Sequence, residues 1–386
     1  MRVLVVSEYY PRAADPVLGV WAHRQALAAR DAGVEVRVLV LHRPIPPLRV
    51  LRRGEVAAAL APLRQPRHQV HDGVEVDYVR YLSPPRPLSY SSWGAWAAPA
   101  LRRALAQLRD EFSFDLVHAH YAVPAGDAVR RAGGFAPLVV SVHGHDVHGP
   151  TAGAPAVRAT LSRARLVLAN SAGTARRSSA CGARRTRVVH LGTDVPAEPR
   201  TPPSVPTLVT VAHLAARKRH EDVIAALGRL RERHPDLRYV IVGAGPEEER
   251  VRGLAGSLGL ADRVELRGAL PHGQAVAAAQ AGTLFVMPSV DEAFGVAYVE
   301  AMAAGVPAIG CSGEDGPEEI ASVGGGIELV APREPDALAA RIDELLGDPE
   351  RLGSVGRAAR ETVQREFTWK RCGIATLGAY EEALRG

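Results

Sequence analysis

Short apolar runs alternate with longer, helix-compatible stretches along this chain. In the first half, runs that predict buried parallel strands are Arg2–Val6, Val34–Leu41, Asp115–His118, Leu138–Val142 and Leu166–Ala169. In the second half, the corresponding runs are Leu208–Ala212, Tyr239–Val242, Val264–Leu266 and Leu284–Met287. The stretch Val20–Ala32 predicts a helix between the first two strands. This repeated alternation predicts an α/β protein with doubly wound parallel sheets.

The two alternating halves are separated by a proline-rich segment, Pro199–Pro206, whose composition is that of a linker. We therefore expect an N-terminal domain over residues 1–198, a hinge over 199–206, a C-terminal domain over 207–364 and a closing segment over 365–386. The closing segment has apolar residues at roughly helical spacing and predicts an amphipathic helix. The Pro- and Arg-rich segment Arg43–His68 is expected to be a mobile, solvated loop, with an acceptor-side or membrane-facing excursion as the alternative.

Composition narrows the range of functions. The length of 386 residues favours two domains, and the apolar fraction of 47% is enough for large cores. The net charge of +5 permits an anionic partner, but the arginines are spread and no nucleic-acid motif accompanies them. Three widely separated cysteines fit a reducing cytosol. We expect a cytoplasmic protein, because Met1–Val6 is too short for a signal peptide and no apolar run reaches the ~18–20 residues of a membrane span. Contact with the inner face of a membrane and the oligomeric state stay open.

The segment Pro288–Pro307 carries the strongest functional pattern. It follows a predicted strand with a polar loop that contains Glu292, and then with a small-residue helix that contains Glu300. The N–H groups at the start of such a helix suit a phosphate, and the two carboxylates would accept hydrogen bonds from a ribose and a sugar. By their spacing alone, the two glutamates are equally explained as a loop charge and a solvated helix residue.

The same segment resembles the signature of the retaining nucleotide-sugar glycosyltransferases of family 4, in which Pro-Ser, Glu, a small residue and Phe-Gly precede a second Glu with Ala-Met-Ala. The resemblance implies the GT-B fold, with two Rossmann-like domains facing each other across a cleft and a C-terminal helix that crosses back to the first domain. It implies that Glu292 holds the donor sugar and Glu300 the ribose. No metal and no cofactor are implied, since the nucleotide sugar is a co-substrate. The implied donor-binding neighbours of Glu292 are Ala293, Phe294, Gly295 and Val296.

A second similarity lies in Val209–His220. Family members carry an Arg and, five positions later, a Lys that bind the diphosphate. Lys218 matches the lysine, whereas His213 stands at the arginine position. Histidine is only partly protonated near neutral pH, so this is a real departure. Either His213 contributes one hydrogen bond, or Arg217 or Arg219 supplies the missing charge.

Further site residues come from the same resemblance. Gly19, at the head of the first predicted helix, would let backbone approach the donor or the acceptor. His143 follows a strand where the family lines the pocket for the acceptor and the donor sugar, and Asp146 would orient it. His120 would shape the same acceptor site, although a structural role is an equal alternative. Arg267 belongs to a segment similar to the one that meets the nucleobase in the family.

Several histidines fall close together and raise the hypothesis of zinc. The order His143-Gly144-His145-Asp146-Val147-His148 is not the spacing of the familiar dinuclear hydrolase motif, so we expect no metal.

The resulting hypothesis is a retaining, metal-independent hexosyltransferase that uses a nucleoside diphosphate sugar, with UDP as the first choice of nucleotide. His143, Lys218 and Glu292 are its predicted catalytic residues. The acceptor would be a hydroxyl of a surface glycan, a lipid-linked precursor, a small cyclitol or a natural product. One alternative is a non-catalytic nucleotide-sugar-binding module, which His213 and the altered Gly310–Glu319 segment would favour. The other is a nucleotide-sugar epimerase on the same fold.

Overall fold

The computed structural model describes residues 1–46, 56–85, 89–149 and 152–386, and these form two compact units. The first unit consists of Met1–Leu191 together with Trp369–Gly386, and the second of Gly192–Thr368. The proline-rich segment 199–206 thus belongs to the second unit. We describe each unit by itself.

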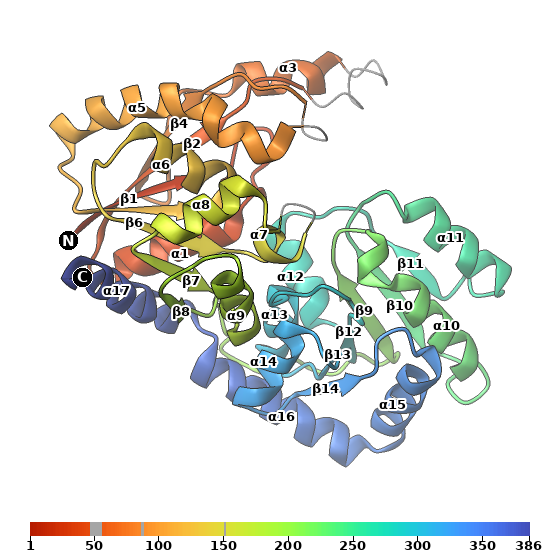
Figure 1. Cartoon of the computed structure of the whole chain (residues 1–386). Coiled ribbons are helices and arrows are strands. Elements are labelled where there is room, and N and C mark those ends of the chain that lie inside the picture. Colours follow the sequence, from red (N-terminus) through yellow and green to blue (C-terminus); the bar gives the residue numbers. More distant parts are fainter. Residues whose placement is uncertain (47–55, 86–88, 150–151) are drawn as a thin grey trace. The chain divides into compact units, whose positions relative to one another are not determined.

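The first unit is built on an eight-stranded sheet of order β3-β4-β2-β1-β5-β6-β7-β8 (Figure 1). Neighbouring strands are parallel except for β3 and β4, which form an antiparallel hairpin. Its strands are β1 (Arg2–Ser7), β2 (Glu35–His42), β3 (His68–His71), β4 (Val74–Arg80), β5 (Leu116–His120), β6 (Leu138–Val142), β7 (Leu166–Ala169) and β8 (Thr186–Val188). The strands β1, β5, β6 and β7 are almost wholly buried, as continuous apolar runs in a parallel sheet require.

Helices cover this sheet, and the helix that closes the chain is one of them. The helical segments are α1 (Val20–Asp31), α3 (Val56–Arg64), η1 (Tyr90–Ser92), α5 (Trp93–Glu111), η2 (Ala122–Gly126), α6 (Asp127–Ala132), α7 (His145–His148), α8 (Pro155–Arg163), α9 (Ala172–Ala180) and α17 (Trp369–Arg385). In Figure 1, α17 runs beside α1 at the edge of the first unit. Buried Cys372 and Tyr380 of α17 pack in one apolar cluster with Val3 and Leu116. The last helix is therefore part of the core of the first unit.

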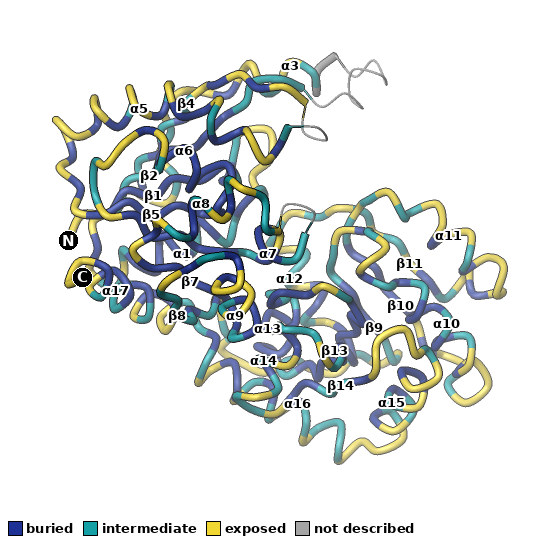
Figure 2. Tube along the Cα trace, viewed as in Figure 1, coloured by how far each residue is buried: buried dark blue, intermediate teal, exposed yellow. Residues whose placement is uncertain are grey.

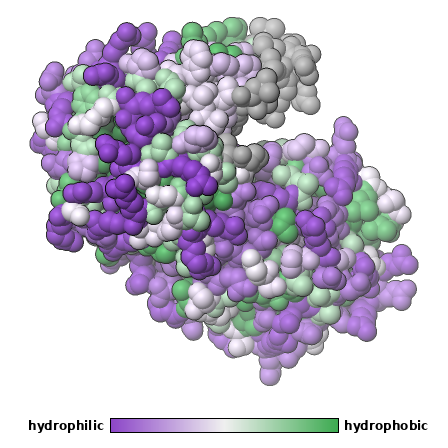
Figure 3. Space-filling view, viewed as in Figure 1, coloured by the Kyte–Doolittle hydropathy of each residue, from purple (hydrophilic) through white to green (hydrophobic). Residues whose placement is uncertain are grey.

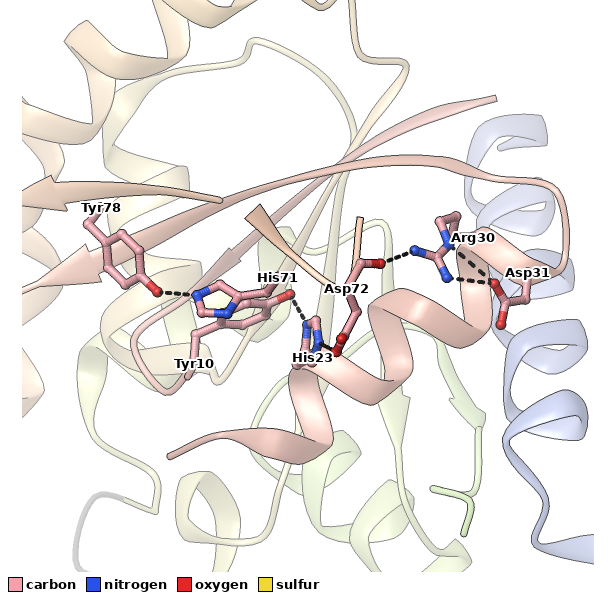
Figure 4. A network of polar contacts seen from close by, with 7 residues as sticks. All are labelled: Tyr10, His23, Arg30, Asp31, His71, Asp72 and Tyr78. Carbon is pink, nitrogen blue, oxygen red and sulfur yellow. Dashed lines mark hydrogen bonds and ion pairs between the residues drawn. The ribbon is translucent and has the colours of Figure 1, made fainter. Parts of the chain in front are cut away.

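A polar network fixes the loop between β1 and α1 (Figure 4). His23 Nε2 lies 2.8 Å from a carboxylate oxygen of Asp72, and His23 Nδ1 lies 2.7 Å from the hydroxyl of Tyr10. Because an ionised carboxylate only accepts hydrogen bonds, Nε2 carries the imidazole proton and Nδ1 accepts from Tyr10. The network ties the first turn of α1 to the β3–β4 turn and to the loop that ends at Gly19.

The second unit has a six-stranded parallel sheet of order β11-β10-β9-β12-β13-β14. Its strands are β9 (Thr207–Val211), β10 (Arg238–Val242), β11 (Val264–Leu266), β12 (Leu284–Val286), β13 (Ala308–Cys311) and β14 (Ile327–Val330). Its helices are η3 (Ala216–Lys218), α10 (His220–Leu230), α11 (Glu248–Ser257), α12 (His272–Gln280), α13 (Val296–Met302), α14 (Asp315–Val323), α15 (Pro335–Gly347) and α16 (Pro349–Glu366). Figure 2 shows the strands as the most deeply buried parts of each unit. The adjacent strands β9 and β12 end beside each other, which brings the two predicted donor-binding segments together.

The predicted architecture of two doubly wound α/β units is confirmed. One expectation was wrong in part, since Val56–Arg64 forms helix α3 inside the segment expected to be a solvated loop. Its alanine-rich sequence has a high helix propensity, which outweighs the internal Pro62. Residues 47–55 of that segment lie outside the described part of the chain.

Within the described ranges, no helix is long and apolar enough to cross a membrane. Figure 3 shows hydrophilic residues over much of the visible face.

Candidate active site

A buried ion pair joins two of the predicted catalytic residues. Lys218, at the end of η3, and Glu292, in the loop after β12, are 8% and 6% exposed. The Nζ of Lys218 lies 2.5 Å from Oε2 of Glu292, which also accepts a hydrogen bond from Ser289 Oγ at 2.9 Å. The chain has two lysines, Lys218 and Lys370, among its 47 basic residues. A lysine kept buried in such an arginine-rich chain indicates a need for a compact point charge.

The charges around the pair decide its protonation. Burial alone would raise the pKa of Glu292, but the positive charges of Lys218 and Arg217 and the hydrogen bond from Ser289 hold this pKa below its usual value. Burial lowers the pKa of Lys218, while Glu292 opposes that effect. Arg217 NH1 lies 3.6 Å from the same carboxylate oxygen, and its side chain is 46% exposed. Two cations thus face the carboxylate of Glu292.

The backbone of Glu292 is held from the next loop, which follows β13. Its N–H donates to Oε2 of Glu314 at 2.9 Å, and its carbonyl accepts from the N–H of Gly316 at 2.8 Å. A Cβ on Gly316 would lie 2.3 Å from the carbonyl oxygen of Phe294, so this close approach requires glycine. Glu314 and Gly316 fall in the segment where the sequence departs from the family pattern. That segment clamps the loop that carries Glu292.

The other predicted donor-binding residues after β12 are two buried side chains and two residues at the start of a helix. Phe294 is 1% exposed, and the centroid of its ring lies 5.7 Å from that of Phe367. Ala293 is also buried, so both side chains pack in the protein interior. Gly295, with φ of 79°, and the half-buried Val296 begin the seven-residue helix α13. These four residues can meet a ligand mainly through backbone.

Glu300 lies on α13 and is 9% exposed. Burial, with a smaller contribution from Asp194, raises its pKa to about 7. His272, at the start of α12, places Nε2 3.6 Å from the carboxylate of Glu300. The carboxyl group of Glu300 therefore changes charge near neutral pH, a property common at functional sites.

The structure separates the basic residues that the sequence left as alternatives. Arg219 makes ion pairs with Glu221 at 2.6 Å and Asp222 at 2.8 Å. Its charge is neutralised within its own segment. The side chain of His213 is exposed just beyond the end of β9. Arg217 is the guanidinium placed beside Glu292, so of the two arginines it is the one that lies next to the Lys218–Glu292 pair.

Arg267 is another predicted donor-binding residue. It is exposed after β11, and its guanidinium bonds to the carboxylate of Glu265, at 2.9 and 3.2 Å.

In the first unit, the predicted histidines form a stacked, hydrogen-bonded group. The rings of His120 and His143 are nearly parallel, with centroids 5.1 Å apart, and His120 Nδ1 lies 2.9 Å from His143 Nε2. His118 bonds to the hydroxyls of Tyr380 and Ser141 at 2.8 and 2.7 Å. Burial lowers the pKa of His143 to about 3, so its ring is neutral. His120 is wholly buried and half-buried His143 is not, so His143 is the histidine of this pair that a ligand can reach.

Asp146 and Gly19 support the surroundings of His143. Asp146 is 2% exposed and accepts a hydrogen bond from the N–H of Ala122 at 2.9 Å. Burial raises the pKa of Asp146 to about 7, while backbone N–H groups, that of Ala122 first, oppose the shift. Gly19 begins α1 with φ of 66°, and a Cβ there would lie 2.1 Å from the carbonyl oxygen of Tyr9. Asp146 thus holds the backbone at Ala122, and Gly19 allows the backbone of α1 to approach that of Tyr9.

Metal ligation receives no support from the described residues, among which no group of three or more His, Cys, Asp or Glu side chains is placed to hold an ion. His118 and His120 instead use ring nitrogens for the hydrogen bonds given above.

Comparison with known proteins identifies the family. The sequence model described as "Glycosyltransferase Family 4" matches residues 18–196, and the model described as "Glycosyl transferases group 1" matches residues 194–362. Together the two matches run through both structural units. This chain belongs to glycosyltransferase family 4. The resemblance that the sequence indicated is thereby confirmed.

Individual relatives and solved structures show which proteins this chain is similar to. It is 34% identical over 171 residues to the GDP-mannose-dependent alpha-(1-6)-phosphatidylinositol monomannoside mannosyltransferase of Mycobacterium tuberculosis, a match that covers 42% of the chain and 44% of that protein. The match thus spans less than half the length of this relative. Two solved structures share the GT-B fold. Sucrose-phosphate synthase from Thermosynechococcus elongatus has a TM-score of 0.79 at 20% identity, covering 100% of this chain and 99% of that one. Anabaena Alr3699/HepE, in complex with UDP and glucose, has a TM-score of 0.75 at 20% identity and covers 99% of both chains.

Some residues of the site could not be named from the sequence. Glu314 and Ser289 act through contacts with Glu292 that depend on loop conformation. Tyr9 and Tyr121 lie around His143, and their sole sequence signal is their position after predicted strands.

Proposed function

We propose that this family 4 member transfers a hexosyl group from a nucleoside diphosphate sugar to a hydroxyl acceptor with retention of configuration. The observation that carries the proposal is the buried Lys218–Glu292 pair with Arg217 beside it. Even a well-paired buried ion pair gives little net stability compared with apolar side chains of similar volume, so stability alone does not account for this arrangement. The pair lies in the part of the chain that the second family model matches.

The proposed roles follow from charge. In the transfer, the bond from the anomeric carbon to the diphosphate oxygen breaks and a bond to the acceptor oxygen forms on the same face. The acceptor proton passes to the departing diphosphate. Lys218 and Arg217 would stabilise the negative charge that develops on the diphosphate, the kind of electrostatic contribution that is usually the largest in catalysis. Glu292 would hold the donor sugar, and Glu300 the ribose. His143, neutral and partly accessible, would contact the acceptor and the donor sugar.

We favour UDP as the nucleotide, because the Anabaena structure of the same fold contains UDP. The mycobacterial relative is named for GDP-mannose, which makes GDP the competing choice. A non-catalytic binding module would not need both Lys218 and Glu292 buried together, and an epimerase would not need an acceptor site.

The test is thermal unfolding of the purified protein with UDP, GDP, ADP or TDP. A nucleotide at about 100 times its Kd stabilises a protein by ~2.7 kcal/mol. We expect selective stabilisation by one nucleotide and its loss in Glu300→Ala. An unchanged melting temperature with every nucleotide would overturn the proposal. Equal stabilisation of wild type and Glu300→Ala would remove Glu300 from the ribose site.

A further inference from the structure

Four aromatic rings in the first unit, one of them the ring of His143, form a closed circuit of contacts. Ring centroids are 6.4 Å apart for Tyr9 and Trp21, 6.2 Å for Trp21 and His143, 4.9 Å for His143 and Tyr121, and 5.0 Å for Tyr121 and Tyr9. The four pairs are tilted by 37° to 56°, so the rings do not stack face to face on one another. Tyr9, Trp21 and His143 are half-buried, and Tyr121 is 9% exposed.

The circuit lies where an open α/β sheet binds ligands. Tyr9, Tyr121 and His143 follow the carboxyl ends of the adjacent strands β1, β5 and β6, and Trp21 lies in the first turn of α1. From β1 the chain moves to β2 on one side of the sheet, while β5 lies on the other side. Ligands bind beyond the carboxyl ends of the strands at such a reversal of strand order.

Two local features indicate that the circuit is not ordinary core packing. Tyr121 has φ of 74°, an unfavourable conformation for a residue with a side chain, and strain of this kind is concentrated at functional sites. The indole N–H of Trp21 is buried and has no acceptor among the described residues. A bound hydroxyl group would supply that acceptor.

We propose that Tyr9, Trp21, Tyr121 and His143 form the acceptor subsite and that the group it takes is an uncharged pyranose ring. The proposal rests on the glycosyl transfer proposed above and names the acceptor class. One face of a pyranose presents mainly C–H groups, which pack on aromatic rings, and its rim of hydroxyls can bond to His143 and to the Trp21 N–H.

The charges nearby argue against a phosphate-bearing acceptor group at this subsite. A phosphate is usually recognised by arginine or lysine, and none of the four rings carries a positive charge. Arg24, one turn along α1 from Trp21, stacks over the Trp369 ring at 5.3 Å. Glu8, beside Tyr9, is buried and accepts a hydrogen bond from the Tyr90 hydroxyl at 2.9 Å, and Arg12 donates to the Glu8 carbonyl at 2.8 Å. Both arginines thus make contacts within the protein, and an aromatic surface favours a saccharide over an inositol phosphate.

The experiment is calorimetric titration of the full chain, saturated with the nucleotide that stabilises it, with maltose and with myo-inositol 1-phosphate. We expect maltose to bind and Trp21→Ala to weaken this binding by about tenfold, while Trp21→Phe, which keeps an aromatic face, stays near wild type. Trp96→Ala is the matched control, because Trp96 is 53% exposed on α5 of the same unit and is absent from the circuit.

The alternative outcomes are distinct. Binding of the inositol phosphate without maltose, binding of neither compound, or equal maltose binding by wild type and Trp21→Ala would each overturn the proposal. Thermal stabilisation of Trp21→Ala by the nucleotide shows that the variant is folded. A failure of the acceptor proposal therefore leaves the donor proposal intact, whereas loss of nucleotide stabilisation in the wild type refutes the donor proposal itself.

Discussion

The two units place different chemistry at the carboxyl ends of similar parallel sheets. In the second unit the groups are charged: the buried Lys218 and Glu292 contact each other, and the exposed Arg217 lies 3.6 Å from the carboxylate of Glu292. In the first unit the corresponding groups are neutral imidazoles and aromatic rings around His143. A diphosphate requires positive charge, whereas a saccharide requires apolar surface with a few hydrogen-bonding groups. The contrast supports our proposal that the second unit binds the donor and the first unit the acceptor.

The units also differ in how they hold their key side chains. Glu292 is fixed mainly by contacts between loops, through Glu314 and Gly316. His143 is fixed by its neighbour on the adjacent strand, His120, which is itself wholly buried. Strand-based support is the more rigid of the two, since strands are anchored along their length by backbone hydrogen bonds. Substitutions that loosen support should therefore affect donor chemistry more than acceptor binding.

The largest expected effect comes from removing the buried ammonium group. Lys218→Ala should lower turnover at least ~100-fold, because the charge that develops on the leaving diphosphate loses one of the two cations proposed to stabilise it. Steady-state kinetics with the selected nucleotide sugar measures this loss. Lys370→Ala is a natural control, since Lys370 is the second lysine of the chain and is exposed on α17. Near-normal turnover in Lys218→Ala would place the diphosphate elsewhere.

Much of the fold could be predicted because buried parallel strands are apolar throughout. The strands Leu138–Val142, Leu166–Ala169 and Val264–Leu266 have the expected bounds. The hairpin of β3 and β4 was not predicted, because its alternating apolar and polar residues form no continuous apolar run, the pattern by which the other strands were recognised. The closing helix was expected to start near residue 365, but Phe367 instead turns into the core of the second unit and α17 begins at Trp369.

The site could be predicted in part. The resemblance to family 4 identified Lys218 and Glu292 as separate site residues, and both are buried. Their direct contact depends on β9 and β12 being neighbours in the sheet, which strand-like runs alone do not reveal. The role of Glu314 was also beyond prediction, since a carboxylate in an altered loop has no preferred partner until the backbone is placed. The aromatic circuit likewise joins residues from four segments.

A smaller effect should follow from releasing the clamp on Glu292. Glu314→Ala should lower turnover ~30-fold, since a misplacement of about 1 Å at a reacting group costs up to ~100-fold. Glu314→Gln keeps an acceptor oxygen for the Glu292 N–H and should recover most of the activity. Glu318→Ala tests for general loop damage, because Glu318 bonds to Gly313 N in the same segment. If the turnover of Glu314→Gln is as low as that of Glu314→Ala while stabilisation by the nucleotide is unchanged, Glu314 has a role other than positioning Glu292.

The smallest expected effect is a pH dependence of nucleotide affinity that arises in Glu300. Burial raises its pKa to about 7, and a ribose hydroxyl donates best to the ionised carboxylate. Below this pKa the bound proton must leave before the hydrogen bond can form, so affinity rises as pH increases through 7. Between pH 6 and pH 8 we expect the Kd of the nucleotide to fall about fivefold more in wild type than in Glu300→Gln, as measured by calorimetry. The Glu300→Gln reference removes the contribution of the titrating phosphate of the nucleotide itself. Parallel pH profiles of nucleotide affinity for the two proteins would mean that the ribose does not bond to Glu300. The contrast between a charged donor unit and a neutral acceptor unit would then rest on Lys218 and Arg217 alone.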